Sequence, residues 1–555
     1  MEHKVQQVPG SILSSDPDWW RGAVIYQIYP RSFQDTNGDG VGDLRGVTER
    51  LDPIAALGAD AIWISPFFKS PMKDFGYDVS DYCAVDGLFG TIEDFDRLIA
   101  EAHARGIRVM IDQVLSHTSD QHAWFKESRS SKDNAKADWY VWADAKADGT
   151  PPNNWLSIFG GSAWEWDTTR CQYYMHNFLT SQPDVNFHCR AAQDALLDTV
   201  EFWLKRGVDG FRLDTVNFYV HSQGLEDNPP SRLEDRNSPE APAVNPYNWQ
   251  DHIHDKSQPE NLEFLKRLRA LLDRYPGQTT VGEIGDGPRS LRTMAAYTSG
   301  GDKLHMCYTF DFLSPIFTKD HFVKRILAFE AIVGDGWPCW AFSNHDIVRH
   351  VSRWTSDGDY DGLAKLAASI LLSLRGSVCL YQGEELGLTE ADIAFEDLQD
   401  PYGIRFWPEY KGRDGCRTPM VWEADRPYAG FSTGKPWLPI PHEHIARAAD
   451  REEKDQQSVL SHYRRMIAFR KAHPALARGS IAFVETPADV LGFVREAAGE
   501  AILCLFNLSA DAVTVPLPSG LNTRQLEGTG FTAISHPLEH SVSLAGRDAF
   551  FAKID

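Results

Sequence analysis

The sequence lacks long hydrophobic runs, is poor in cysteine and has no excess of positive charge. No apolar run reaches the ~18 residues of a membrane span, and residues Met1 to Trp20 contain no signal-like apolar stretch. The eight cysteines form no C-x-x-C pair and mostly occupy apolar runs, as reduced core residues do. These absences argue against a membrane-bound or secreted protein and predict a cytoplasmic one.

The charge balance argues against nucleic acid and anionic membranes as partners. The chain has 55 Lys and Arg against 78 Asp and Glu, for a net charge of −23. Because binding to phosphate groups requires a basic surface, neither nucleic acid nor an anionic membrane is expected as a partner. The balance suits an enzyme with a neutral small-molecule substrate, although good solubility alone would explain it equally well. It leaves a monomer and a homodimer equally open.

Short apolar runs alternate with amphipathic helical stretches through most of the 555 residues. The helical stretches are expected at 91–105, 190–206, 262–272, 319–333 and 360–375. Strand and helix alternating eight times favours an α/β protein of the (β/α)₈ TIM-barrel class over a doubly wound sheet. The expected strands are 23–29, 61–67, 107–115, 208–214, 279–284, 305–311, 337–343 and 377–382.

Two insertions and a tail interrupt this rhythm. Residues 1–117 are expected to form the first part of the barrel, 118–185 an inserted subdomain after strand three, and 186–478 the rest of the barrel. The second insertion, 217–260, is a long loop after strand four and is rich in Pro, Asn and Asp. Short β-like runs in residues 479–555 predict a C-terminal antiparallel β-sandwich.

Charged side chains occur where four of the predicted strands end. These positions are Asp112 to His117, Arg212 to Asp214, Glu283, and Asn344 to Asp346. In a (β/α)₈ barrel the carboxyl ends of the strands meet at one rim, where catalytic residues gather. Separate structural ion pairs, such as one between Arg212 and Asp214, are the alternative. Four such pairs would not be expected to share one position at the strand ends.

These segments resemble, in order and spacing, those of the α-amylase superfamily, glycoside hydrolase family 13. The resemblance runs from Ile25 to the C-terminal tail. The segment Gln182 to Asn186 is similar to the marker of the α-glucosidase and oligo-1,6-glucosidase branch. This resemblance implies a retaining glycosidase with Asp214 as nucleophile, Glu283 as general acid and base, and Asp346 as stabiliser of the oxocarbenium-like transition state.

Physical chemistry adds expectations about this pair of carboxylates. A retaining pair stands ~5–5.5 Å apart, so that no water fits between its members. The pKa values of the pair should be pushed in opposite directions. Arg212 lies two residues before Asp214, on the same strand face, and is expected to keep Asp214 ionised. Glu283 is expected to have a raised pKa and to start protonated.

The resemblance also implies which residues bind the sugar. His117 and His345 would donate hydrogen bonds to glucose hydroxyls, and Tyr77 would stack under the ring, unless it is simply a core aromatic. Asp74 would pair with Arg417 and close one end of the site, leaving a pocket for a single terminal glucose. Thr215 follows the nucleophile, where valine goes with α-1,6 preference in this branch, so maltose-type α-1,4 bonds are favoured.

A structural metal is implied as well. The segment 35–43 places oxygen ligands at alternate positions, but Gly46 stands where an EF-hand has glutamate, so an EF-hand is rejected. In the α-glucosidase branch the matching loop binds Ca²⁺, and Mg²⁺ is the second choice of ion. A turn without an ion is the alternative, and Ser116 argues against a second calcium site. The ligands would be Asp35, Asn37, Asp39, Val41 and Asp43.

The function expected from these observations is an exo-acting α-glucosidase that releases terminal glucose, with transfer to hydroxyl acceptors as a further activity. Oligo-1,6-glucosidase, sucrose hydrolase and sucrose isomerase are alternatives that use the same intermediate. A non-catalytic relative, such as the barrel subunit of amino-acid transporters, is a remote alternative. Such a relative lacks the carboxylates that this chain retains at Asp214, Glu283 and Asp346.

Overall fold

A closed parallel barrel forms the centre of the molecule. The computed structural model describes residues 13–236, 238–355, 357–517, 521–536 and 540–555, so residues 1–12, where no targeting segment is predicted, lie outside it. Eight strands pair in the order β11-β10-β9-β5-β2-β1-β13-β12, and a parallel bridge between Cys307 and Pro338 joins the two end strands. The strands are β1 (Val24–Ile28), β2 (Ala61–Ile64), β5 (Arg108–Gln113), β9 (Gly210–Leu213), β10 (Thr279–Ile284), β11 (Met306–Thr309), β12 (Cys339–Ala341) and β13 (Ser377–Tyr381).

The strands form here because their residues are apolar on both faces, as a buried parallel sheet requires. Side chains such as Trp63, Met110 and Val281 fill the barrel interior. The register then brings the polar strand ends together. Arg212 of β9 is paired with Asp112 of β5 on one side and with Val281 of β10 on the other. Glu283 lies two residues beyond Val281, at the same end of the barrel.

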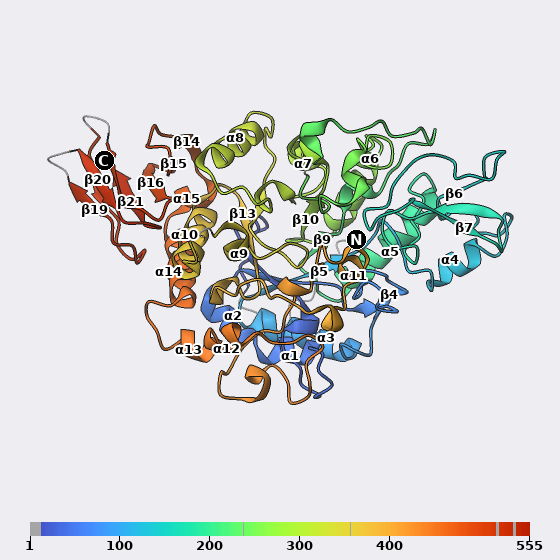
Figure 1. The fold of residues 1–555 in the computed structure, drawn as a ribbon, viewed down its shortest axis with the longest axis horizontal. Helices are drawn as coiled ribbons and strands as arrows, with labels where there is room; N and C mark the ends of the chain where they lie inside the picture. Colours follow the sequence, from blue (N-terminus) through green and yellow to red (C-terminus); the bar gives the residue numbers. More distant parts are fainter. Residues whose placement is uncertain (1–12, 237, 356, 518–520, 537–539) are drawn as a thin grey trace.

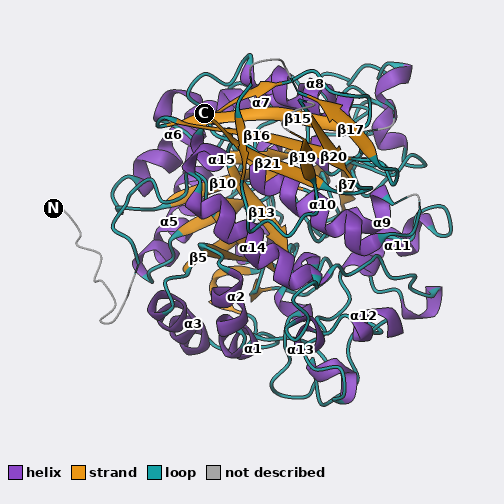
Figure 2. Cartoon of the chain, turned by 90° about the vertical axis from the view of Figure 1, so that its left-hand side faces the viewer, coloured by secondary structure: helices purple, strands orange, loops and turns teal. Residues whose placement is uncertain are grey.

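Helices surround the barrel (Figure 2). Leu265, Leu268 and Leu272 of α6 (Asn261–Leu272), one of the predicted helices, are buried. At α3, the Thr91 side chain accepts from the Asp94 backbone N–H and completes a capping box, which explains where this helix begins. The helices that follow the strands are α1 (Leu44–Glu49), α2 (Leu51–Leu57), α3 (Ile92–Ala104), α5 (Arg190–Lys205), α6 (Asn261–Leu272), α7 (Ser290–Thr298), α8 (Lys319–Glu330), α9 (His350–Trp354), α10 (Tyr360–Ser373) and α14 (Val459–Ala472).

Two further units lie at opposite ends of the molecule in Figure 1. Between β5 and α5 the chain forms helix α4 (Ala123–Ser128) and a small sheet of β6 (Trp142–Ala143), β8 (Gln172–Met175) and β7 (Trp164–Asp167). After α15 (Pro474–Arg478) the chain forms two antiparallel sheets that share one apolar core. The first contains β14 (Ser480–Phe483), β15 (Val490–Ala497), β16 (Glu500–Asn507), β21 (Ala549–Ile554) and β18 (Thr523–Gln525); the second contains β17 (Val513–Pro516), β20 (Ser541–Leu544) and β19 (Ile534–His536).

This architecture confirms the predicted fold class, a (β/α)₈ barrel with an insertion after the third strand and a C-terminal β-sandwich. None of the helices in the described residues is both long and apolar enough to cross a bilayer. All eight cysteines are free, and five of them are buried. The buried five agree with their prediction as core residues, whereas Cys83 and Cys171 are exposed.

Candidate active site

One buried arginine organises the rim of the barrel. The Arg212 side chain is 0% exposed, and its guanidinium contacts three carboxylates. Nη1 lies 2.8 Å from Asp112 Oδ1 and 2.7 Å from Asp214 Oδ1, and Nη2 lies 2.6 Å from Glu283 Oε2. A buried charge is costly without partners, so these residues hold one another in place. The alternative of an isolated Arg212–Asp214 ion pair therefore does not describe the site.

Asp214 and Glu283 lie next to each other at the edge of one cavity. Both contact the same guanidinium and also Thr215, whose backbone N–H donates to Glu283 Oε2 at 3.2 Å and whose hydroxyl donates to Asp214 Oδ2 at 3.2 Å. Both carboxylates line a cavity of about 410 Å³. A cavity of this size admits a sugar ring beside the pair. The two side chains therefore face one compartment, as a retaining mechanism requires.

The pKa values of this pair differ from the expectation in two respects. Burial raises the pKa of Glu283 to about 7, although Arg212 opposes the shift, and this agrees with a group that starts protonated. Burial also raises the pKa of Asp214 to about 7, against the same opposing effect of Arg212. The expectations that the two pKa values are pushed in opposite directions and that Arg212 keeps Asp214 ionised are not met at neutral pH, because burial outweighs the lowering effect of a guanidinium that three carboxylates share. The pair therefore shares about one proton near neutral pH.

A bell-shaped pH dependence of kcat/KM follows from these shifts. As pH rises above neutral, the pair loses the shared proton, so no acid remains to protonate the leaving group. As pH falls, Asp214 binds a proton and is no longer a nucleophile. We expect a maximum near neutral pH when maltose hydrolysis is measured between about pH 5 and about pH 9. A rate that stays constant across this interval would contradict the assignment of the two titrating groups.

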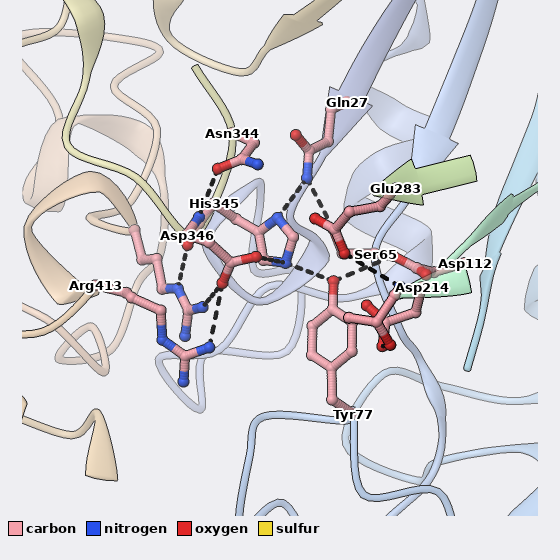
Figure 3. A network of polar contacts seen from close by, with 12 residues as sticks. Gln27, Ser65, Tyr77, Asp112, Asp214, Glu283, Asn344, His345, Asp346 and Arg413 are labelled. Atoms are coloured by element: carbon pink, nitrogen blue, oxygen red, sulfur yellow. Dashed lines mark hydrogen bonds and ion pairs between the residues drawn. The ribbon is translucent and has the colours of Figure 1, made fainter. Parts of the chain in front are cut away.

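Asp346, the third predicted catalytic residue, has a lowered pKa, whereas the pKa values of Asp214 and Glu283 are raised. Its Oδ1 accepts from Arg417 Nη2 at 2.8 Å and from Arg413 Nη1 at 3.1 Å, and its Oδ2 lies 3.2 Å from His345 Nε2 (Figure 3). Burial alone would raise its pKa, but His345 and the two arginines hold the pKa of Asp346 well below its usual range. Asp346 is therefore ionised at neutral pH, as a residue that stabilises positive charge must be.

The partner of Asp74 differs from the prediction. Asp74 Oδ1 lies 2.9 Å from Nη2 of Arg413, not from Arg417. Arg413 is fixed by Asp400, whose Oδ1 accepts from the same Nη2 at 2.8 Å. Arg417 instead donates from Nε to the His345 carbonyl at 2.6 Å and from Nη2 to Asp346. The predicted pairing of Asp74 with Arg417 is therefore wrong, because Arg413 reaches Asp74 while His345 and Asp346 hold the Arg417 guanidinium.

Tyr77, His117 and His345, the other residues predicted to bind the sugar, lie in the same region. Their polar atoms form hydrogen bonds with other groups of the protein. Tyr77 lines the cavity and stacks on His345, with ring centroids 5.4 Å apart. Gln27 donates to His345 Nδ1 at 2.8 Å, which leaves Nε2 of that buried ring as the donor. His117 also lines the cavity, and its Nε2 donates to the Tyr77 carbonyl at 3.0 Å. Their contacts to glucose hydroxyls remain predictions.

Three further residues of the site were not predicted. Arg413 is the first of them, and Tyr308 is the second: it donates from its hydroxyl to Glu283 Oε1 at 2.9 Å. The third is Gln182, which donates to Asp74 Oδ2 at 3.1 Å and so links the branch marker to the Asp74–Arg413 pair. Gln182 could have been predicted from the sequence, because it belongs to the segment from Gln182 to Asn186 that resembles the branch marker. Arg413 lies only four residues before Arg417, in a stretch without periodicity.

The predicted metal loop is held together by its own hydrogen bonds. The Asp35 carboxylate accepts from the backbone N–H groups of Asn37, Gly38 and Gly40 at 2.8–2.9 Å. Asp43 accepts from Gly46 in the same way, as the N-cap of α1. Within the described residues, no group of three or more His, Cys, Asp or Glu is placed to hold a metal ion. The all-oxygen donor set suits a hard cation, and the metal site remains a prediction.

A parallel barrel whose rim presents three acidic side chains, those of Asp214, Glu283 and Asp346, around one cavity of about 410 Å³ has the architecture of a glycoside hydrolase. Residues 27–479 match the Alpha-amylase family, described as alpha amylase, catalytic domain. The chain belongs to this family, the α-amylase superfamily or glycoside hydrolase family 13, and to its α-glucosidase and oligo-1,6-glucosidase branch.

Known proteins of this branch resemble the chain over nearly its whole length. A probable alpha-glucosidase of Rhizobium meliloti (strain 1021) is 64% identical, over 99% of this chain and 100% of that protein. An oligo-1,6-glucosidase of Heyndrickxia coagulans is 37% identical, over 95% and 99%. The crystal structure of an alpha-glucosyl transfer enzyme, XgtA, superposes with a TM-score of 0.94 at 56% identity, covering 97% and 99%. A mutant of MutB in complex with the substrate sucrose superposes with a TM-score of 0.87 at 36% identity, covering 97% and 99%. MutB is a trehalulose synthase from Pseudomonas mesoacidophila MX-45.

Proposed function

We propose that the protein is a retaining, exo-acting α-glucosidase that releases terminal glucose from short α-glucosides and also transfers glucose to hydroxyl acceptors. The ion pair between Asp74 and Arg413 supports this most strongly, because both residues line the same cavity as Asp214 and Glu283, where the pair would close one end. A closed end admits the last sugar of a chain and excludes an internal one. Asp214 would form the glucosyl ester, and Glu283 would protonate the leaving oxygen and then activate the acceptor.

Product analysis on maltose, isomaltose and sucrose, side by side, tests this proposal. Release of α-glucose as the first product, before mutarotation, is expected from each substrate that is cleaved. Release of β-glucose, or cleavage only inside longer chains, would contradict it. Oligo-1,6-glucosidase and sucrose isomerase activity are second candidates, supported by the similarity to the Heyndrickxia coagulans enzyme and to MutB. The same experiment separates them, because sucrose isomerisation yields a disaccharide rather than glucose.

Preference for α-1,4 bonds is the finer part of the proposal. Thr215 lines the cavity beside the nucleophile, and its hydroxyl lies 3.2 Å from both Asp214 Oδ2 and Ser116 Oγ. Its backbone is left-handed (φ 38°), and its hydroxyl lies between Asp214, which follows β9, and Ser116, which follows β5. A branched apolar residue here would lose both hydrogen bonds and would change the shape of the acceptor entrance.

Thr215→Val is therefore expected to lower the ratio of maltose to isomaltose hydrolysis by about tenfold, as changes of one group in a binding pocket do. The measurement is kcat/KM for both disaccharides. Thr150→Val is the matched control, since Thr150 is exposed in the inserted segment, and it should leave the ratio unchanged. An unchanged ratio in Thr215→Val would remove this basis for linkage preference.

We further propose that the loop from Asp35 to Asp43 binds Ca²⁺, or Mg²⁺ in its place, in a structural role. These residues do not line the cavity of the catalytic carboxylates. EDTA is expected to lower the thermal unfolding midpoint by about 2–4 °C while the rate of maltose hydrolysis at low temperature stays the same. Added Ca²⁺ should restore the midpoint, and Asp39→Asn should abolish both effects. A midpoint that does not respond to EDTA would leave the loop without an ion.

We also propose a cytoplasmic protein that works as a monomer or a homodimer on small sugars. The absence of disulfides among its eight cysteines supports a reducing compartment. Fractionation of the cells that produce it, together with light scattering of the purified protein, tests both parts. A disulfide in the purified protein would argue against this compartment.

A further inference from the structure

A second buried cation lies close to the catalytic carboxylates. The Lys256 side chain belongs to the long loop between β9 and α6 and is buried. Its ammonium donates to Glu240 Oε2 at 2.9 Å and to the Gly285 carbonyl at 2.9 Å. It also lies 4.6 Å from the ring centroid of Phe218 and 5.3 Å from that of Tyr247. A buried ammonium is costly without such partners, so these contacts fix its position.

Side chains of the long loop hold the chain directly after β10. This strand ends at Ile284, one residue after Glu283. The next residue, Gly285, donates its N–H to Asn217 Oδ1 at 3.2 Å, and its carbonyl accepts from Asn217 Nδ2 at 2.7 Å as well as from Lys256. Asn217 itself lies three residues after the predicted nucleophile. The ends of the two catalytic strands are therefore joined through Gly285, and Lys256 adds a charged donor to this link.

Glu240 completes the link on the other side of Lys256. Its Oε1 accepts the backbone N–H of Gly287, while its Oε2 binds the ammonium. It also packs directly on Gly285, where a β-carbon would lie 3.3 Å from Glu240 Cδ. Glu240 lines the cavity of the catalytic carboxylates, and both Glu240 and Lys256 line a second cavity of about 230 Å³. The carboxylate therefore borders both cavities, whereas Lys256 borders only the second.

The position of Glu283 depends on its backbone as well as on the partners of its carboxylate. A general acid has to lie within hydrogen-bond reach of the leaving oxygen. Two residues beyond Glu283, the Gly285 carbonyl is held by Lys256. Without the ammonium, the Glu240 carboxylate would be buried without its counter-charge and would have to take up a proton or move away from Gly285. Either change would disturb the end of β10.

We propose that Lys256 is a positioning residue for Glu283: through Glu240 and the Gly285 carbonyl it holds the end of β10 where Glu283 can protonate the leaving oxygen. The inference rests on the proposed function, because it assigns a role in the proton transfer from Glu283. Lys256 does not line the catalytic cavity, so it would not contact the sugar. Its removal is expected to weaken protonation of the leaving group more than attack by Asp214.

Lys256→Met tests this proposal, because methionine has an apolar chain of similar length and lacks the ammonium. The substrates are phenyl α-glucoside and 4-nitrophenyl α-glucoside, whose leaving groups have nearly the same shape. Phenol requires protonation to depart, whereas 4-nitrophenol departs as the anion. We expect kcat/KM to fall about 10²-fold for the phenyl glucoside and by less than about threefold for the nitrophenyl glucoside, as for a misplaced general acid.

A purely structural role would give a different result. A general loosening of the cavity would lower both kcat/KM values by the same factor, because both substrates need the same glucose pocket and the same nucleophile. Lys136→Met is the matched control. Lys136 forms an ion pair with Glu127 at 2.7 Å in the inserted segment, and its replacement should leave both values unchanged.

Chemical rescue by propylamine is a second measurement. In Lys256→Ala the deleted atoms correspond to propylammonium, and the second cavity, which Lys256 lines, offers a small amine a path to the gap. Propylamine is expected to raise kcat/KM for phenyl α-glucoside about tenfold in this variant, the equivalent of one charge-assisted hydrogen bond. The value for 4-nitrophenyl α-glucoside should stay the same. The unaltered protein in the same solution shows any direct effect of the amine.

The possible results separate this inference from the proposed function. Equal losses with both glucosides, or no loss with either, would overturn the inference and leave the α-glucosidase proposal intact. Failure of the unaltered protein to cleave any α-glucoside would overturn both. If the lysine variants fail to fold, Glu240→Gln decides, since it keeps the volume of the side chain and removes its charge. It should lower kcat/KM about tenfold for the phenyl glucoside alone, and equal effects on both substrates would overturn the inference.

Discussion

Asp214→Asn is expected to lower the rate of maltose hydrolysis by about 10⁴- to 10⁶-fold, the range seen when a catalytic nucleophile is removed. The amide keeps the size of the carboxylate but cannot form the ester with the anomeric carbon. Arg212 keeps its contacts with Asp112 and Glu283, so the rim retains its buried charge pairs. The initial rate at saturating maltose is the measurement.

Two controls make this result specific. The thermal unfolding midpoint of the variant should stay close to that of the unaltered protein, which shows that the fold is intact. Asp302→Asn, at an aspartate whose side chain is 52% exposed, should retain full activity. A rate for Asp214→Asn within tenfold of the original would exclude Asp214 as the nucleophile.

Glu283→Gln has the second largest expected effect, a loss of about 10²- to 10⁴-fold with maltose, as for other general acid–base residues. Glutamine can accept the Tyr308 hydrogen bond that Glu283 Oε1 receives at 2.9 Å, but it cannot supply a proton. The loss in the first step should be much smaller with 4-nitrophenyl α-glucoside, because its leaving group departs without protonation. The ratio of the two rates, in variant and unaltered protein, measures the role of the proton.

Azide distinguishes the two roles. In Glu283→Gln, azide should attack the glucosyl ester without needing a base and yield α-glucosyl azide. In Asp214→Gly, where the missing side chain leaves room for the anion, azide should attack the substrate directly from the opposite face and yield β-glucosyl azide. The same anomer from both variants would contradict the assignment of nucleophile and acid.

Much of this architecture could be predicted from the sequence because buried parallel strands leave a strong signal. The strand from Gly210 to Leu213 reads as apolar residues interrupted by one arginine and followed by an aspartate. A charged side chain at the end of such a run is expected at the rim of the barrel, because burial inside the sheet without a partner would be costly. For this reason Arg212, Asp214 and Glu283 could be assigned to one site before their contacts were known.

Other features could not be predicted, since they depend on contacts that no local pattern records. Arg413 and Arg417 lie in an irregular stretch, and only the folded chain shows that the first one reaches Asp74. The raised pKa of Asp214 depends on how completely the site is buried and on how many carboxylates share Arg212. The apolar residues that line the cavity include Pro239, Phe310 and Val348, which come from loops after three different strands of the barrel.

The guanidinium of Arg212 is the counter-charge of three carboxylates at once, and this limits how the enzyme can be altered. Any replacement of Arg212 would act on Asp112, Asp214 and Glu283 at once. A substitution at this position would therefore change the rates of both steps of the reaction together. A substitution of Tyr308 would affect fewer carboxylates, since its hydroxyl contacts only Glu283 among them and also Arg212. An engineer who wants a more alkaline enzyme would begin with the neighbours of the acid and leave the shared cation in place.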